Sequence, residues 1–423
     1  MHGKYRLQKG VLMRDIGRHT TAISARDSFK YFCLGLPLLL LFLFFPVSFT
    51  AAESDITLSL DAQERFSDNF YRSETEKIKV YTTIIKPGIT TRAWTDRSSV
   101  LFAYSPTFNY YSDDSDMVDV SKDDFVGHEL AFMAETTLFE RLKLNLTDRF
   151  QETREPGAYD VLRESAADRE RYRINQVSPF MTYDFAEKFT VILGYQYEVY
   201  NYEDSENSYE HRGYFTLRYH LDDRNSLEVE EQYWGRRYPT NPDYDSSQTK
   251  LIFRRELSDF LKCEIGGGYH NRTFESGRAG VQDFDGFVYR LALTGESDVS
   301  RLFLSYRRNL NDFSKGTAYF DAHRVTVNVE HTFLEKLMCS LGGYYQKNDY
   351  ETTTGTTAAG TTELREDEIW DGSVGIKYRM ADWLSAGIYY AYSDRDSNIT
   401  GQSYLEKKVY GNIKFEYSSA KRK

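Results

Sequence analysis

The sequence has only one long apolar run in 423 residues, which excludes a bundle of membrane helices. Each helix of such a bundle would need about twenty consecutive apolar residues. The mean hydropathy of -0.60 agrees with this exclusion. A membrane β-barrel remains compatible with these values, because only alternate residues of its strands face lipid.

Cysteine is also scarce, and the familiar catalytic motifs are missing. Cys33 lies in the apolar run, and Cys263 and Cys339 fall on segments that we expect to lie well apart, so no disulfide is predicted. No H-E-x-x-H, phosphate-cradling glycine loop or C-x-x-C is present. We therefore expect no cofactor, no metal and no catalytic residues.

Basic residues are fewer than acidic ones, 53 against 64, and this argues against a nucleic-acid partner. The single apolar run, residues 31–49, follows seven Lys or Arg residues and precedes Thr50-Ala51-Ala52. This order is typical of a secretory signal peptide, so we predict signal residues 1–52, with Met13 as an alternative start, and one domain over 53–423. The alternative, an uncleaved anchor helix, is less favoured because Pro37 and Pro46 interrupt the run. The predicted mature chain has a formal charge of −16.

Short and long connections alternate strictly along the predicted mature chain. The short turns are 94–98, 138–142, 184–188, 221–225, 257–261, 296–300, 333–337 and 380–384. The longer connections are 112–124, 155–171, 202–210, 238–247, 273–285, 312–321, 348–368 and 393–402. With a first strand near 56–66 and a last near 404–417, the pattern predicts an all-β fold. The predicted architecture is a transmembrane antiparallel up-and-down β-barrel of about 18 strands, with short periplasmic turns and long extracellular loops.

Residues alternate between apolar and polar within the strands, as in 189–199 and 325–333. Segment 227–233 fits poorly because Glu231 falls on the apolar face, which suggests a bulge or a position near the rim. Aromatic residues make up 16% of the chain and gather at strand ends, as expected at membrane interfaces.

The polar face supplies the candidate site. Its charged members are predicted to line the pore: Arg149, Arg173, Arg218, Arg254, Arg290, Arg307, Arg324, Arg379, Glu129, Glu198, Glu256 and Glu330. An acidic cluster occupies one long connection: Asp113, Asp114, Asp116, Asp119, Asp123 and Asp124. A barrel of eighteen strands is too wide for side chains to fill, so we expect these groups to face water. Bases and acids nearly balance on the wall, so the acidic loops predict a mild preference for cations.

Segments 63–71 and 82–89, with the opening E-x-F-x-D-N at Glu64–Asn69 and the pair Pro87-Gly88, carry a family resemblance. They resemble the outer-membrane β-barrel porin family that is often encoded beside exosortase and exopolysaccharide loci. The likeness covers about the first third of the predicted mature chain. It implies a barrel in the outer membrane of a Gram-negative bacterium and a link to envelope polysaccharide, and it supplies no catalytic residues.

The predicted function is a channel for polar solutes, linked through this resemblance to exopolysaccharide transport. The alternatives are a non-conducting docking barrel of a polysaccharide or protein-sorting system and, less favoured, a barrel enzyme. The expected partners are outer-membrane lipid, the barrel assembly machinery and a polar solute or saccharide.

Overall fold

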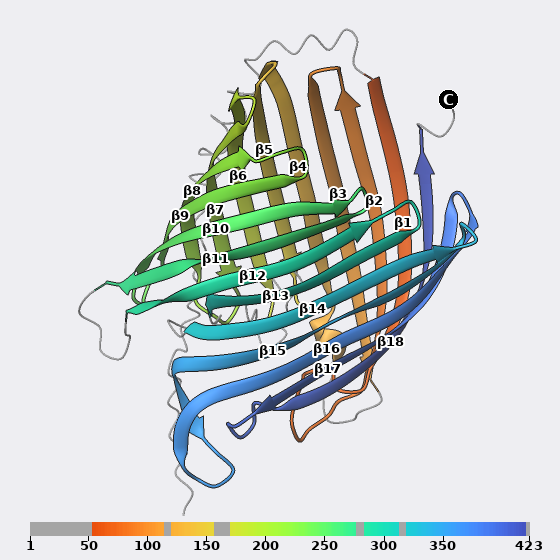
Figure 1. Ribbon diagram of the computed structural model, residues 1–423. Coiled ribbons are helices and arrows are strands. Elements are labelled where there is room, and N and C mark those ends of the chain that lie inside the picture. Colours follow the sequence, from red (N-terminus) through yellow and green to blue (C-terminus); the bar gives the residue numbers. More distant parts are fainter. Residues whose placement is uncertain (1–52, 114–119, 156–169, 276–282, 313–318, 420–423) are drawn as a thin grey trace, which may run out of the picture. The chain divides into compact units, whose positions relative to one another are not determined.

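The computed structural model describes residues 53–113, 120–155, 170–275, 283–312 and 319–419. They form one antiparallel sheet of eighteen strands in which each strand pairs with its neighbours in chain order, and β1 pairs with β18 (Figure 1). The sheet is therefore a closed barrel, and the predicted fold class is confirmed. Residues 1–52 lie outside the described residues, so the signal peptide stays a prediction.

The strands are β1 (Glu53–Ser67), β2 (Val80–Trp94), β3 (Ser98–Asp113), β4 (Phe125–Phe139), β5 (Leu142–Thr153), β6 (Tyr172–Ala186), β7 (Phe189–Tyr202), β8 (Ser208–His220), β9 (Asn225–Arg237), β10 (Tyr244–Ser258), β11 (Leu261–Phe274), β12 (Phe284–Glu296), β13 (Ser300–Asp312), β14 (Tyr319–Phe333), β15 (Leu337–Thr356), β16 (Thr362–Ala381), β17 (Leu384–Ser397) and β18 (Tyr404–Ser418). The 3₁₀ helix η2 (Val120–Asp123) is the single helical element within the described ranges. No helix in that part of the chain is long and apolar enough to cross a membrane.

All eight predicted short turns join consecutive strands where the sequence places them. We call this end of the barrel the turn end and the opposite end the loop end. One predicted long connection, 348–368, is wrong in extent. Its residues extend β15 and β16 to Thr356 and Thr362, so the connection is only 357–361. The threonine-rich sequence there favours extended backbone because β-branched residues suit strands.

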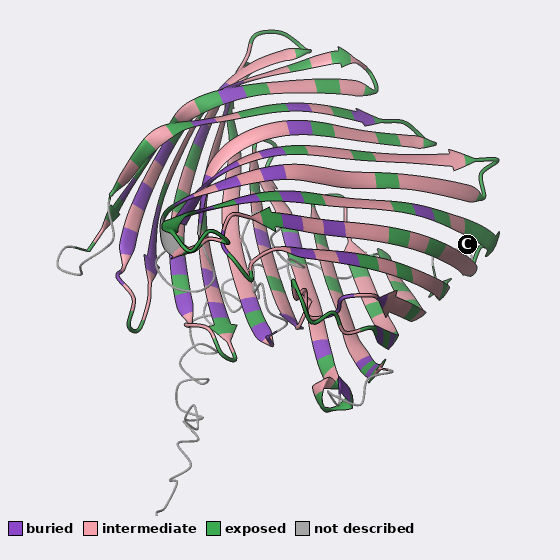
Figure 2. Cartoon of the chain, turned by 90° about the horizontal axis from the view of Figure 1, so that it is seen from below, coloured by how far each residue is buried: buried purple, intermediate pink, exposed green. Residues whose placement is uncertain are grey.

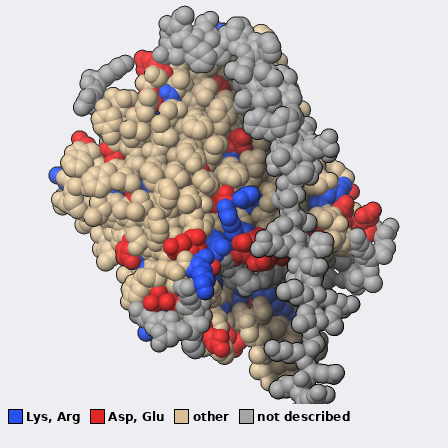
Figure 3. Space-filling model, turned by 180° about the vertical axis from the view of Figure 1, so that it is seen from behind, with Lys and Arg blue, Asp and Glu red and all other residues tan. Residues whose placement is uncertain are grey.

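The pairing registers assign each residue to a face, because residues directly opposite in a sheet point the same way. On β7, Leu193 and Tyr195 point outward and are exposed, whereas Thr190 and Glu198 point inward and are buried. This alternation recurs across neighbouring strands (Figure 2). Seen from behind, a broad area of the wall carries few charged side chains, and Lys, Arg, Asp and Glu gather near the middle and below it (Figure 3). Exposed apolar side chains on the outer face are what a lipid bilayer would cover.

Two local features test the sequence-based interpretation of single strands. Strand β9 pairs with β8 and β10 without a register shift, so the suspected bulge at Glu231 is wrong. Glu231 points outward and accepts a hydrogen bond from Thr249. On β11, a Cβ added to Gly268 would lie 2.0 Å from the carbonyl oxygen of Thr249. Close backbone approach therefore explains this glycine.

Candidate functional site

The polar inner face of the barrel is the candidate site. The registers place all the predicted pore-lining residues on this face except Arg173. Arg173 shares the outer face of β6 with Val177 and Tyr183, and it forms an ion pair with Glu152 of β5 at 3.1 Å. The assignment of Arg173 to the pore therefore does not fit the structure. A charged residue can occupy the outward set here because it lies at the loop end of its strand.

A continuous set of ion pairs crosses the inner face of β8–β12. Arg218 of β8 contacts Glu228 of β9. Arg254 of β10 then bridges Glu228 and Glu264, with nitrogen–oxygen distances of 3.3 Å to each. Arg290 of β12 closes the series on Glu264 at 3.1 Å. The sheet geometry permits this arrangement because inward residues of neighbouring strands lie within reach of long side chains.

Arginines also occupy the next register positions on β13 and β14. Arg307 is the register partner of Arg290, and Arg324 is the register partner of Arg307. Arg324 is buried and stacks its guanidinium 3.4 Å from the centre of the Tyr344 ring. Cation–π contact of this kind favours a guanidinium in a partly dry site.

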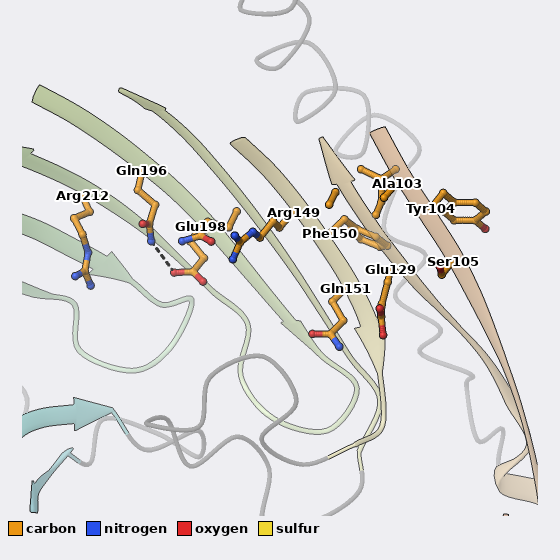
Figure 4. Close-up of a pocket in the computed structure, with 13 residues that line it drawn as sticks. Ala103, Tyr104, Ser105, Glu129, Arg149, Phe150, Gln151, Gln196, Glu198 and Arg212 are labelled. Carbon is orange, nitrogen blue, oxygen red and sulfur yellow. Dashed lines mark hydrogen bonds between the residues drawn. The ribbon is translucent and has the colours of Figure 1, made fainter. Parts of the chain in front are cut away.

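A cavity of about 610 Å³ lies on the inner face of β3–β8 (Figure 4). Arg149, Gln176 and Glu198 are register partners across β5, β6 and β7 within it. Gln151 and Gln196 add amides, and Gln196 donates to Glu198 at 3.3 Å. Amides both donate and accept hydrogen bonds, so this wall can bind neutral hydroxyl-bearing solutes as well as charged ones.

Several charged residues on the inner face are not among those predicted from the sequence. Arg236 and Arg272 are buried near the loop end and stack on Tyr200 and Tyr244, at 4.4 and 4.0 Å. Arg365, also buried, forms an ion pair with Asp367 and stacks on Tyr350. The same period-two parity would have found these arginines, since each lies in an inward register. Their burial could not be read from it.

The acidic cluster is partly engaged in structure. Asp123 forms an ion pair with Arg154 at 2.8 Å and accepts a hydrogen bond from the Tyr71 hydroxyl at 2.6 Å. Burial and this hydrogen bond raise the pKa of Tyr71 above its ordinary value. Asp124 accepts a bond from the backbone N–H of Tyr111 at 2.7 Å. Asp113 ends β3, whereas Asp114, Asp116 and Asp119 lie outside the described residues.

Contacts across the loop end narrow the barrel mouth. Arg65 of β1 forms an ion pair with Glu155, which follows β5, at 2.8 Å. Four strand-to-strand steps separate β1 from β5 along the wall, so Glu155 reaches inward to make this contact. Beside it, the buried side chains of Phe70, Tyr111 and Val120 form a small hydrophobic cluster.

The six histidines of the predicted mature chain are divided between the two faces of the barrel. His128, His211, His323 and His331 lie on the outer face, and His220 and His270 lie on the inner face. Ser300 Oγ lies 2.7 Å from His331 Nδ1, the pairing that a hydrolase nucleophile needs. In the described part of the chain, no carboxylate hydrogen-bonds to the His331 ring to orient it. No three His, Cys, Asp or Glu side chains there could hold a metal ion.

Residues 229–417 match the family model described as "Putative beta-barrel porin 2". The porin resemblance is thus confirmed, although the match lies in the second half of the chain and the sequence analysis drew it from the first strands. No curated protein sequence matches the chain.

Solved structures to which the chain is similar include the following three. OpdK of Pseudomonas aeruginosa, crystallised with vanillate, is 12% identical, with a TM-score of 0.46 over 86% of this chain and 99% of that one. OccK9 (OpdG) of the same organism is 11% identical, with a TM-score of 0.49 over 86% and 99%. OccAB4 of Acinetobacter baumannii is 10% identical, with a TM-score of 0.48 over 87% and 100%.

Proposed function

We propose that this chain, part of which matches a β-barrel porin family, is an outer-membrane channel for polar solutes in a Gram-negative bacterium. The observation that carries the proposal is the exposure of charged groups on the inner face. The side chains of Arg254 and Arg290 are 42% and 51% exposed, although they point into the barrel. Ionised groups that remain this accessible need water around them, so the proposal assigns a water-filled lumen.

Amide and charged groups on the wall suit hydroxylated solutes, and saccharides are the class we propose first. Three glutamines, Gln151, Gln176 and Gln196, border the larger cavity together with Arg149 and Glu198. A link to exopolysaccharide transport is part of the proposal and rests on the family resemblance. The outer face is proposed to contact outer-membrane lipid after insertion by the barrel assembly machinery.

A non-conducting docking barrel is the second candidate. The ion pair between Arg65 and Glu155, which narrows the loop end, favours it. The proposed channel and this alternative differ in one measurable property, the passage of ions through the lumen.

Planar-bilayer recording of the purified mature barrel in 1 M KCl tests the proposal. We expect discrete conductance steps, and the same preparation denatured by boiling should produce none. A preparation that shows the heat-dependent gel mobility of a folded barrel and yet gives no steps would establish the docking alternative.

A further inference from the structure

We propose that the inner face of β8–β13 binds oxyanions and favours solutes that carry a carboxylate, sulfate or phosphate group. The inference rests on the proposed channel function and deepens it by naming the class of solute. Its structural basis is the arginine track, which we define as Arg218, Arg254, Arg290 and Arg307.

Burial separates the two signs of charge along this track. Glu228 is only 2% exposed and Glu264 16%, whereas Arg254 and Arg290 are 42% and 51% exposed. The carboxylates therefore lie beneath the guanidinium groups and hold them in place. A guanidinium has five N–H donors in a planar fork that matches an oxyanion, and these ion pairs use only some of them. A solute in the lumen thus meets a cationic surface, although the formal charges nearly balance.

The register adds a second, independent observation. Arg290, Arg307 and Arg324 are direct partners on three consecutive strands. Three guanidinium groups therefore follow one another along this part of the inner face. An oxyanion between Arg290 and Arg307 would accept hydrogen bonds from two guanidinium groups, and the exposed guanidinium of Arg290 is positioned to meet it.

A cavity of about 440 Å³ lies at the turn end of the track, and Arg218, Arg254 and Arg290 line it. This volume falls within the range of small-molecule sites, about 300–1,000 Å³. The acids that also line it are mostly engaged. Glu256 pairs with Lys262 at 2.6 Å, and Asp222 accepts backbone N–H groups of its own turn. Glu264 is paired with Arg254 and Arg290, which leaves Asp223 as the remaining acid on the cavity wall.

The proposal reverses the ion selectivity that the sequence predicts from the acidic loops. Asp123 is neutralised by Arg154, and Asp124 is engaged by the backbone. The sequence predicts a mild cation preference because acidic and basic residues nearly balance on the wall. The arginine track gives the wall a stronger effect on ion selectivity than the loops have. A charge on the lumen wall lies closer to the permeating ion than a charge at the mouth, so its electrostatic interaction with the ion is stronger.

The first experiment measures reversal potential under a KCl gradient at low salt for the full mature barrel. We expect chloride preference for the wild type and a shift toward potassium for Arg290→Gln combined with Arg307→Gln. Arg308→Gln is the matched control. Arg308 follows Arg307 in the chain but points outward and pairs with Asp321, so its removal should leave selectivity unchanged.

The second experiment measures block of the chloride current by sodium gluconate and, separately, by inorganic phosphate. We expect both to block, and the double variant to raise the half-blocking concentration about tenfold, as expected for lost charge-assisted hydrogen bonds. Block by only one of the two would identify the oxyanion source. Arg307→Lys keeps the charge without the planar fork, so it should retain chloride preference and weaken block.

The possible failures are distinguishable. An absence of current from folded barrel would overturn the channel itself. Current with potassium preference, or selectivity and block that the double variant leaves unchanged, would overturn the oxyanion site and leave the channel intact. Heat-dependent gel mobility shows whether the barrel of each variant folds. If the double variant does not fold, Arg307→Lys is tested in its place.

Discussion

Glu406 on β18 is a fully buried carboxylate, and its partners explain how the barrel tolerates it. Ser67 donates to it at 2.8 Å, and Arg72 and Lys408 contact it at 3.0 and 3.2 Å. These contacts join β1, the connection after it and β18. A buried charge with several partners is costly to break, because removing it leaves the opposite charges unpaired.

Replacing this carboxylate should therefore destabilise the barrel more than replacing an exposed one. Glu406→Gln is expected to lower the free energy of unfolding by about 3 kcal/mol, measured by urea titration in detergent micelles. Glu416→Gln is the control on the same strand and face, where the partly exposed carboxylate pairs with Lys414. Its loss should stay below about 1 kcal/mol. Equal losses would show that burial at Glu406 adds nothing.

The wrong prediction for Arg173 shows where alternation along a single strand fails to predict the direction of a side chain. Period-two parity identifies the inward set wherever the outward set is apolar, as on β7. Near the loop end that condition fails, because strands leave the apolar layer and charges can point outward. Arg173 lies in such a place, and the registers with β5 and β7 show its direction.

At the scale of elements, the turn between β8 and β9 is stabilised by one side chain. Asp222 accepts hydrogen bonds from the backbone N–H groups of Arg224 and Asn225 at 2.8 and 2.9 Å. The Asn225 side chain also donates to it, and these bonds, led by that of the Asn225 side chain, hold the pKa of Asp222 below its ordinary value. The folded turn therefore stabilises the ionised form of the Asp222 carboxylate.

The contribution of Asp222 should depend on pH. A lowered folded pKa makes the stabilisation fully present above the unfolded value of about 3.9 and lost as the pH falls through the folded value. Asp222→Ala should lower the temperature at which the barrel changes from its folded to its unfolded gel mobility. This decrease should be constant from pH 7 to 5, and the difference from wild type should shrink below about pH 4. A difference that grows on acidification would contradict the assignment.

At the scale of the whole molecule, the barrel depends on the pairing of its two end strands. Eleven register pairs join β1 to β18, from Thr57 with Ser418 to Ser67 with Lys408. Without them, both strands would present unpaired backbone donors and acceptors to the hydrocarbon layer, where each costs several kcal/mol. Closure is thus a requirement of the fold.

Two truncations test this requirement. Removal of residues 412–423 deletes seven of those β18 partners, and we expect loss of heat-dependent gel mobility and of the protein from the outer-membrane fraction. Removal of residues 420–423 leaves every partner in place and should change neither property. Normal assembly of the longer truncation would mean that another strand can replace the missing pairing.

The sequence by itself determined the strands, the turns between them and most of the inward residues, because period-two alternation and turn chemistry act over a few neighbouring residues. The tertiary structure decided the rest. Stacked arginines such as Arg236, the extension of β15 and β16, the engagement of Asp123, and the arginine track all depend on side chains brought together from different strands. The register and closure of the barrel create those contacts, and they set which charges are buried and which face the lumen.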